Sequence, residues 1–582
     1  MIKTLASQIK EYKRDAILTP ICMIGEVFCE MMIPLLMGIM VNEGVESGDM
    51  TTIYKLGSGM ILLALLGLMF GMLGGKFGAR ASAGLAKNLR EAMFNNIQTF
   101  SFSNIDKFST PSLVTRLTTD VTNIQNVFQM ILRMFTRAPI TMISAMVLSF
   151  SVNARLASIY LVAVIILGIF INFIIRKATK YFSEIFPKYD DLNESIQENV
   201  TGIRVVKAFV REENETEKLK KASANIYRLF VSAENIIICN MPAMMLTVYT
   251  CILLVSWFGA HFIVIEGMQT GDLMTLLTYC INILSSLMMV SMMFVFLTLS
   301  AASGKRICEV LNEKSDLTNP ENPVYEIPDG SVDFNHVTFR YHERSERPVL
   351  DDINLHIHSG ETIGIIGGTG SSKTSLVNLL SRLYDVESGE LKVGGRNVKE
   401  YDLETLRDKV SVVLQKNVLF SGTILDNLRW GDPDASLEDC KRVCRLACAD
   451  EFIERFPDGY NTVITQGGSN VSGGQKQRLC IARALLKKPS ILILDDSTSA
   501  VDTATDARIR RAMAEEIPNT TKIIIAQRIS SVQHADRILV LDNGCVSGFD
   551  THENLIATNE IYREVYESQQ GGNGDFDEGG AA

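Results

Sequence analysis

Residues 363–374 read Ile-Gly-Ile-Ile-Gly-Gly-Thr-Gly-Ser-Ser-Lys-Thr, so an apolar run leads through a glycine-rich stretch to Lys373 and Thr374. The apolar run predicts a strand, and the residues from Lys373 onward predict a helix. The N–H groups of such a loop and the N-terminus of the helix form a cradle for phosphate groups. The lysine would reach the β- and γ-phosphates, and the threonine hydroxyl would ligate Mg²⁺. The predicted phosphate site comprises Gly367, Gly368, Thr369, Gly370, Ser371, Ser372, Lys373, Thr374 and Ser375.

One position of this loop departs from the general pattern. Ser372 stands directly before the lysine, where glycine is usual. Serine keeps the backbone N–H but restricts φ, so we expect phosphate binding to survive with an altered fit.

A second apolar run, Ile491-Leu-Ile-Leu-Asp495, ends in an acid that would hold Mg²⁺ through water. It follows the loop by about 120 residues, and the two motifs together predict a nucleotide-binding domain. Strand-like runs alternate with helical patterns around them, at 362–366, 410–414, 491–494, 522–526 and 537–541. This alternation predicts an α/β domain with a mainly parallel sheet.

Long apolar runs dominate the first half of the chain. A membrane span needs about 20 mostly apolar residues. Six runs meet this criterion, at about 17–41, 57–78, 134–152, 156–176, 241–265 and 274–298. Two long connections, near 79–133 and 177–240, look helical and are rich in Lys and Arg, whereas the short loops are mainly acidic. The positive-inside rule therefore places the long connections in the cytoplasm, and we expect a polytopic α-helical membrane domain.

The change in composition between the two halves predicts the domain boundaries. Asn, Asp, Pro and Glu gather just after the last apolar run and indicate a linker. We expect a transmembrane domain over 1–311, a linker over 312–330, a nucleotide-binding domain over 331–566 and a disordered, Gly-rich tail over 567–582. The formal net charge of −10 gives no reason to expect a nucleic-acid partner.

Two carboxylates lie inside the first predicted span. Glu26 and Glu30 are four residues apart and therefore share one face of the helix. A charge within the bilayer is costly and marks a functional site by default, so we expect both residues to line the substrate path. Two alternatives stay open: a position near a helix end, or pairing with polar groups such as Asn240 or Asn282.

Three cysteines have a spacing that could suggest a metal site. Cys440, Cys444 and Cys448 recur every four residues, which indicates one face of a helix. No fourth thiol or histidine stands nearby in the sequence, so we expect buried thiols instead.

Val471-Ser-Gly-Gly-Gln475 lies between the two nucleotide motifs. It resembles the signature of ATP-binding cassette (ABC) transporters, and further motifs agree in order. Tyr341, in Val337-Thr-Phe-Arg-Tyr341, matches the aromatic residue that stacks on adenine, and Gln415 matches the glutamine of the Q-loop. Ser499-Ala-Val-Asp502 matches the D-loop, and residues 198–209 resemble the second intracellular loop of multidrug-type exporters.

The resemblance implies a half-transporter that binds ATP and Mg²⁺ and pairs with a second half-transporter. Two cassettes of this family enclose two ATP molecules, each between one chain's phosphate loop and the other chain's signature. Ser472, Gly473, Gly474 and Gln475 would therefore serve the partner's ATP. The Mg²⁺ ligands implied in this chain are Thr374, Gln415 and Asp495, and the catalytic residues are Asp496, Gln527 and Gln415.

Three residues depart from the family's pattern, although the signature is intact. Asp496 follows the strand acid where glutamate is usual, and the missing methylene withdraws the carboxylate from the attacking water. Gln527 replaces a histidine and carries no positive charge. Gln466 replaces a glutamate before the signature. We expect a heterodimer with one degenerate and one competent ATP site; a working homodimer is the alternative.

These features predict an ABC-type ATPase that exports amphipathic small molecules, drugs or lipids, across the plasma membrane. The predicted protein is multi-pass, contacts membrane lipid and holds its nucleotide-binding domain in the cytoplasm. A peptide or metabolite exporter and an ATP-gated channel or regulatory subunit are the alternatives.

Overall fold

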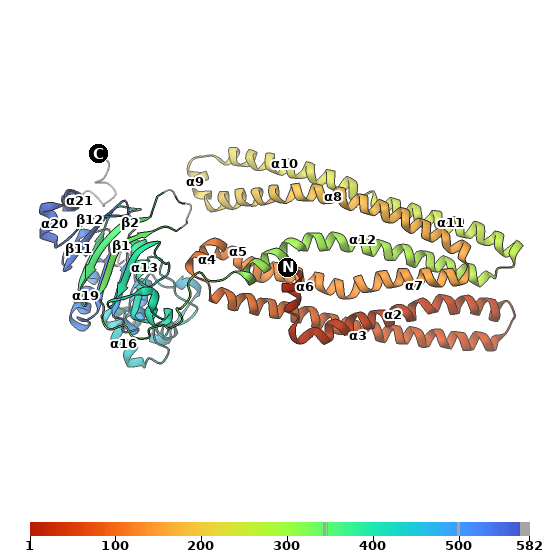
Figure 1. Ribbon diagram of the computed structural model, residues 1–582, viewed down its shortest axis with the longest axis horizontal. Helices are drawn as coiled ribbons and strands as arrows, with labels where there is room; N and C mark the ends of the chain where they lie inside the picture. The colour runs from red at the N-terminus through yellow and green to blue at the C-terminus, as the bar shows by residue number, and fades with distance from the viewer. Residues whose placement is uncertain (342–344, 346, 497–500, 571–582) are drawn as a thin grey trace. The chain divides into compact units, whose positions relative to one another are not determined.

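The structure, a computed structural model, describes residues 1–341, 345, 347–496 and 501–570. Contacts between residues divide the chain into two units (Figure 1). The helical unit comprises Met1–Gln98 and Ser109–Glu313. The second unit, which we call the cassette unit, comprises Thr99–Phe108 and the chain from Lys314 onward.

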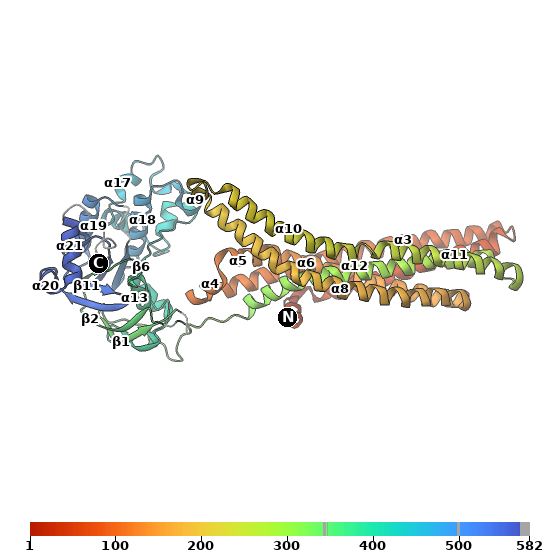
Figure 2. The same cartoon turned by 90° about the horizontal axis from the view of Figure 1, so that it is seen from above.

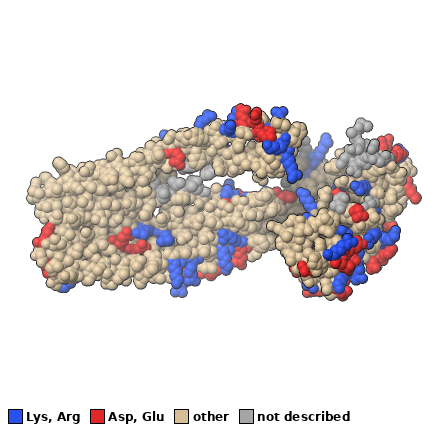
Figure 3. All heavy atoms as spheres, turned by 180° about the vertical axis from the view of Figure 1, so that it is seen from behind, with Lys and Arg blue, Asp and Glu red and all other residues tan. Residues whose placement is uncertain are grey.

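The long helices of the helical unit are α2 (Lys13–Ile39), α3 (Met50–Gln98), α7 (Thr136–Val152), α8 (Ala154–Thr201), α10 (Glu212–Ile237), α11 (Asn240–Glu266) and α12 (Thr270–Asn312). Among the described residues, six helical segments are long and apolar enough to cross a membrane, as predicted. They are Lys10–Val45, Met50–Gln98, Thr110–Val152, Ala154–Ala178, Glu212–Glu266 and Thr270–Val290. Wide areas of this unit carry no charged side chain on the face drawn in Figure 3.

Several of these helices are much longer than a bilayer is thick. The 49 residues of α3 span about 73 Å, against about 30 Å of hydrocarbon. α8 and α10 (Glu212–Ile237) run side by side in both views and are joined by the short α9 (Ile203–Ala208) (Figures 1 and 2). The remaining elements of the unit are α1 (Ile2–Ser7), η1 (Lys10–Tyr12), η2 (Met40–Val45), α5 (Thr110–Thr115), η3 (Arg116–Asp120), α6 (Val121–Met130) and η4 (Ile131–Phe135).

The core of the helical unit packs α2, α7, α8, α11 and α12 together. Two buried tyrosines connect these helices by hydrogen bonds. Tyr279 on α12 donates to the carbonyl of Met31 at 2.7 Å, and Tyr160 on α8 donates to the carbonyl of Leu276 at 2.9 Å. Pro34 interrupts the hydrogen-bond ladder of α2, because proline has no N–H to donate.

The cassette unit is an α/β domain built on two sheets, in agreement with the predicted fold class. The larger sheet has the strand order β12-β11-β3-β10-β9-β6, and its pairings are parallel except for the edge strand β12. Its strands are β3 (Thr362–Ile366), β6 (Val410–Val413), β9 (Ile491–Asp495), β10 (Thr521–Ile525), β11 (Arg537–Asp542) and β12 (Cys545–Asp550). The second sheet is antiparallel, with the order β2-β1-β4-β5: β1 (Val332–Phe339), β2 (Leu350–Ile357), β4 (Ser388–Val393) and β5 (Arg396–Asn397).

The cassette unit also contains the following helices. They are α4 (Phe102–Phe108), α13 (Lys373–Leu380), η5 (Val398–Glu400), α14 (Leu403–Lys409), α15 (Ile424–Leu428), α16 (Leu437–Leu446), α17 (Asp450–Ile453), η6 (Gly459–Asn461), η7 (Gln466–Gly468), α18 (Gly473–Leu486), α19 (Thr503–Glu516), η8 (Ile529–Ser531), α20 (His552–Thr558) and α21 (Glu560–Gln570). A two-stranded ribbon, β7 (Gly422–Thr423) with β8 (Val463–Ile464), completes the unit.

Two local expectations differ from the structure in detail. α21 continues to Gln570, four residues into the segment expected to be a disordered tail. α16 ends at Leu446, so Cys448 lies beyond the helix that carries Cys440 and Cys444. All three thiols are buried, which confirms the prediction of structural cysteines.

Candidate functional site

The phosphate loop connects β3 to α13, and its backbone has little space for side chains. A Cβ atom at Gly367 would lie 2.3 Å from the carbonyl oxygen of Leu541 and 2.4 Å from Ser371 Oγ, so only glycine fits. Gly370 has a φ of +85°, which also favours glycine. Lys373 Nζ donates to the carbonyls of Gly367 at 2.7 Å and Gly368 at 2.8 Å. The ammonium group therefore lies over the loop whose N–H groups precede α13.

Ser372 adopts a left-handed conformation, with φ +75° and ψ 23°. An L-residue with a Cβ pays about 1–2 kcal/mol for this region, whereas glycine pays almost nothing. The departure from glycine noted in the sequence thus falls on a position whose backbone conformation favours glycine.

Two oxygen ligands suited to Mg²⁺ lie together beside this loop. The Thr374 hydroxyl, in the first turn of α13, forms a side-chain hydrogen bond with Asp495 at the end of β9. Asp495 is only 2% exposed. Burial raises the pKa of its carboxyl group, and the Thr374 hydrogen bond and the Lys373 charge oppose that rise. A hydroxyl next to a buried carboxylate fits a small hard cation that prefers oxygen ligands.

Three residues proposed to act on the attacking water also converge, because their strands are neighbours in the sheet. Asp496 follows β9, Gln527 follows β10 and Gln415 follows β6. Gln527 Nε2 lies 3.4 Å from Asp496 Oδ2, and the Gln415 side chain hydrogen-bonds Asp496. Asp496 has a φ of +48°, and burial raises the pKa of its carboxyl group. Two amide side chains thus hydrogen-bond Asp496, whose side chain is one methylene shorter than that of glutamate.

Tyr341, predicted to stack on adenine, stands at the end of β1 and is 37% exposed. Its hydroxyl shares a hydrogen bond of 2.8 Å with Ser375 of α13, which connects the predicted adenine position to the phosphate loop. Its ring meets those of Phe339 and Tyr384 edge to face, at centroid distances of 4.9 and 5.0 Å.

Sequence reasoning missed Tyr384 and its partner on α4. The Tyr384 hydroxyl donates to Asp106 Oδ2 at 2.8 Å, and its ring lies 6.1 Å from that of Phe102. Burial and the Asp106 carboxylate raise the pKa of Tyr384. No local pattern could have joined these residues, because 278 positions separate Asp106 from Tyr384.

The signature residues form the start of α18. Ser472 is its N-cap: its hydroxyl accepts from the Gln475 N–H at 3.3 Å, and its own N–H donates to Gln475 Oε1 at 2.9 Å. Gly473 and Gly474 occupy the first turn, where helix N–H groups attract anions. Gln466 lies in η7 and is exposed. In the D-loop, Ser499 and Ala500 lie outside the described residues, and Asp502 caps α19 by accepting from Thr505 N–H.

The two carboxylates of the first span have a partner that the sequence reading did not consider. Arg137 on α7 donates to Glu26 Oε1 at 3.0 Å and to Glu30 Oε2 at 2.8 Å. The structure does not pair them with Asn240 or Asn282, the alternative left open above. Arg137 stands within the third apolar run, and a lone arginine in such a run was the available signal.

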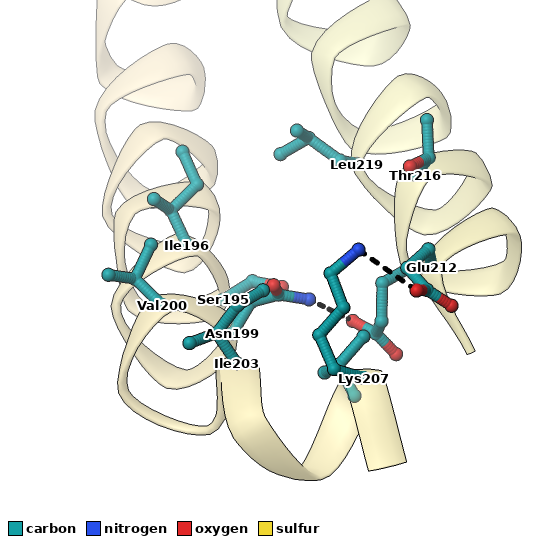
Figure 4. Close-up of a pocket in the computed structure, with 11 residues that line it drawn as sticks. Ser195, Ile196, Asn199, Val200, Ile203, Lys207, Glu212, Thr216 and Leu219 are labelled. Atoms are coloured by element: carbon teal, nitrogen blue, oxygen red, sulfur yellow. Dashed lines mark hydrogen bonds and ion pairs between the residues drawn. The ribbon is translucent and has the colours of Figure 1, made fainter. Parts of the chain in front are cut away.

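A cavity of about 300 Å³ lies where α8, α9 and α10 meet (Figure 4). Ile196, Val200 and Leu219 give it apolar walls. Two polar pairs cross its edge, Lys207 with Glu212 and Asn199 with Glu215, both at 2.9 Å. These pairs hold the turn around α9 together.

The comparisons with known proteins agree with this geometry. The family model of the ABC transporter transmembrane region matches residues 16–288, and that of the ABC transporter matches residues 350–499. An uncharacterized ABC transporter ATP-binding protein of Bacillus subtilis, YfiB, is 37% identical over 568 residues, with 98% of each chain covered. The uncharacterized Rv1273c of Mycobacterium tuberculosis is 35% identical over 574 residues, again with 98% of each chain covered.

A solved structure of a bacterial Atm1-family ABC exporter with ATP bound has the same fold. The TM-score is 0.82 at 23% identity, covering 96% of this chain and 99% of that one. The chain therefore belongs to the ABC transporter family, as an ABC-type ATPase with a transmembrane domain, a nucleotide-binding domain and the ABC exporter fold.

Proposed function

We propose that this chain is one half of a heterodimeric ABC exporter and that its own ATP site hydrolyses slowly. The complex would export amphipathic small molecules, drugs or lipids, across the plasma membrane, with the cassette unit in the cytoplasm. The observation that carries the proposal is the contrast between Asp496, held by two glutamine side chains, and the fully formed cap of the signature helix at Ser472.

ATP would bind with its adenine on Tyr341 and its phosphates against the loop from Gly367 to Ser375. Lys373 would exchange its bonds to the loop carbonyls for bonds to the β- and γ-phosphates, since a charge-assisted bond to phosphate is the stronger one. Thr374, Asp495 and Gln415 would hold Mg²⁺, which neutralises phosphate charge when bound.

Hydrolysis at this site would be slow for two reasons. The Asp496 carboxylate is one methylene short, and a displacement of about 1 Å from the attacking water costs roughly a hundredfold in rate. Gln527 places a neutral amide where a charged donor would stabilise the phosphate, and its Nε2 lies beside Asp496 Oδ2. The site would bind ATP but hydrolyse it slowly, so the nucleotide would stay bound for a long time.

The signature of this chain would serve the partner's ATP. Ser472 and the amides of Gly473 and Gly474 form a helix N-terminus suited to a γ-phosphate. In a homodimer both sites would contain the misplaced acid, whereas in a heterodimer a competent partner site can use this signature. The contrast within one chain favours the heterodimer.

Two apolar surfaces support the need for a second chain. The tip around α9 exposes Ile203, Val205 and Phe209. The cassette unit has a groove of about 340 Å³, lined in part by the stacked rings of Phe420 and Trp430, both exposed. We propose that each groove receives the corresponding tip of the partner chain, which would bury both surfaces.

Steady-state ATPase of the purified pair tests this function. Asp496→Asn is expected to change turnover less than twofold, because the site contributes little hydrolysis. Gly474→Asp is expected to lower turnover about a hundredfold, because it puts a negative charge where the partner's γ-phosphate binds. Loss of turnover with Asp496→Asn, or normal turnover with Gly474→Asp, would contradict the heterodimer and favour the homodimer.

A further inference from the structure

The intramembrane ion pairs form a compact group of three side chains, Glu26, Glu30 and Arg137, which we call the charge triad. One guanidinium bridges two carboxylates that stand one turn apart on α2. The distances from the Arg137 guanidinium nitrogens to Glu26 Oε1 and Glu30 Oε2 are 3.0 and 2.8 Å, so both carboxylates form ion pairs with it. Each carboxylate uses one oxygen in these pairs. Its other oxygen accepts no hydrogen bond from the residues that the structure describes.

The charge triad lies deep within the predicted membrane spans. Counted from Ile17, where the first apolar run begins, Glu26 and Glu30 are about 14 and 20 Å along the helix. The hydrocarbon core is about 30 Å thick, so these side chains stand near its middle. Gly71 of α3 lies beside Glu26: a Cβ atom there would stand 3.4 Å from Glu26 Oε2.

The charges of the triad do not cancel. Two carboxylates and one guanidinium leave a net charge of −1. Arg133, one turn before Arg137 and beside Gly78, makes no ion pair with either glutamate in the described part of the chain. Pro34 adds further negative potential, because it has no N–H to donate to the Glu30 carbonyl. An uncompensated charge at this depth is costly unless something neutralises it.

The side chains of the triad are also partly exposed on the single chain. They are 42% exposed at Glu30, 35% at Arg137 and 19% at Glu26. Met134, in η4 three residues before Arg137, is exposed and offers an apolar, adaptable side chain. A charged centre beside an apolar surface suits an amphipathic ion.

We propose that the charge triad binds the single positive charge of an amphipathic substrate, such as a tertiary amine or a quaternary onium ion. This inference rests on the proposed export function and names the substrate class of its path. A bound monocation brings the net charge of the site from −1 to zero, whereas a bound monoanion would bring it to −2. Arg137 sets this preference: without it the two carboxylates would favour dications.

A pair of isosteric ions tests the charge preference directly. Tetraphenylphosphonium and tetraphenylborate have the same shape and opposite charge, so their relative binding reports the sign of the site. Binding is measured by equilibrium dialysis without ATP, on the full-length protein in the assembly in which it purifies. Glu26→Gln/Glu30→Gln changes the net charge from −1 to +1, and Glu30→Gln alone changes it to zero.

The ratio of phosphonium to borate affinity should fall about tenfold or more in the double variant and to an intermediate value in Glu30→Gln. Arg137→Lys should keep the phosphonium preference, because it keeps the charge while losing the bridge. The matched control is Glu266→Gln, which removes a carboxylate from the exposed pair with Arg155, 2.9 Å apart. An unchanged ratio in Glu30→Gln, equal to that of the control, overturns the proposal even where the double variant fails to fold.

A second measurement separates this proposal from the export function. ATP-driven accumulation of a neutral amphipathic dye in inside-out vesicles reports export alone. If the dye accumulates but the variants leave the phosphonium-to-borate affinity ratio unchanged, the binding role of the charge triad is wrong and the export function stands. If the variants shift the affinity ratio but no ATP-driven accumulation occurs, the export function is wrong and the cation-binding site stands.

Discussion

At the scale of single residues, Ser372 joins a strained backbone to a binding function. Its φ of +75° places a Cβ atom in the left-handed region. Ser372→Gly is therefore expected to stabilise the protein by about 1 kcal/mol and to leave ATP binding equal or tighter. Thermal unfolding and nucleotide titration measure both effects.

The neighbouring Ser371 provides the control for that substitution. Ser371 is buried, its φ is not positive, and its hydroxyl accepts from Lys373 Nζ at 3.3 Å. Ser371→Gly should therefore lower stability and weaken ATP binding. Equal effects of the two substitutions would mean that the left-handed backbone carries no strain.

Asp495 illustrates the conflict between stability and function at one carboxyl group. Burial raises its pKa, so the folded state binds a proton more tightly than the unfolded state. The stabilisation from this proton is fully present below the ordinary pKa of the carboxyl and is lost as pH rises through the folded-state pKa. At neutral pH the buried charge therefore destabilises the nucleotide-free protein.

Asp495→Asn is expected to raise the unfolding temperature of the nucleotide-free protein at pH 7.5 by a few degrees, and by less at pH 4. The same variant should lose ATPase activity, because the Mg²⁺ ligand is gone. Differential scanning fluorimetry at the two pH values measures the first effect. Glu515→Gln, an exposed position on α19, is the control, and a gain of equal size there would contradict the argument.

At the level of helices and strands, Tyr384 joins α4 to Tyr341, the residue predicted to stack on adenine. The chain leaves α3, forms α4, and there Asp106 and Phe102 both contact Tyr384. The Tyr384 ring in turn supports the Tyr341 ring edge to face. The seven-residue α4, which follows α3 in the sequence, thus belongs to the cassette unit and reaches its predicted nucleotide site.

Two substitutions separate the ring of Tyr384 from its hydroxyl. Tyr384→Ala should weaken ATP binding roughly fivefold, because an aromatic edge-to-face pair contributes about 1 kcal/mol beyond its buried area. Tyr384→Phe keeps the ring and should leave affinity unchanged, while it removes the hydrogen bond to Asp106. Titration of ATP against the purified protein measures both, and equal losses in the two variants would assign the effect to the hydroxyl instead.

At the scale of the whole molecule, two kinds of sequence pattern produce two separate units. Long, mostly apolar helices form the helical unit, and alternating strands and helices form the cassette unit. In the proposed heterodimer, Asp496 and the complete signature cap of this chain would belong to two different ATP sites. The ATPase and ion-binding tests above both address that assembly.

Local sequence patterns are enough to predict the six apolar helices, the α/β cassette and the phosphate loop, because each follows from a pattern of hydrophobicity or glycine. Which distant side chains meet depends on how the elements pack. Strand order brings Gln415, Asp496 and Gln527 together, and helix packing sets Arg137 against Glu26, 111 residues away. Local periodicity fixes which face of an element is buried, but not which partner covers it, so these contacts depend on the folded chain.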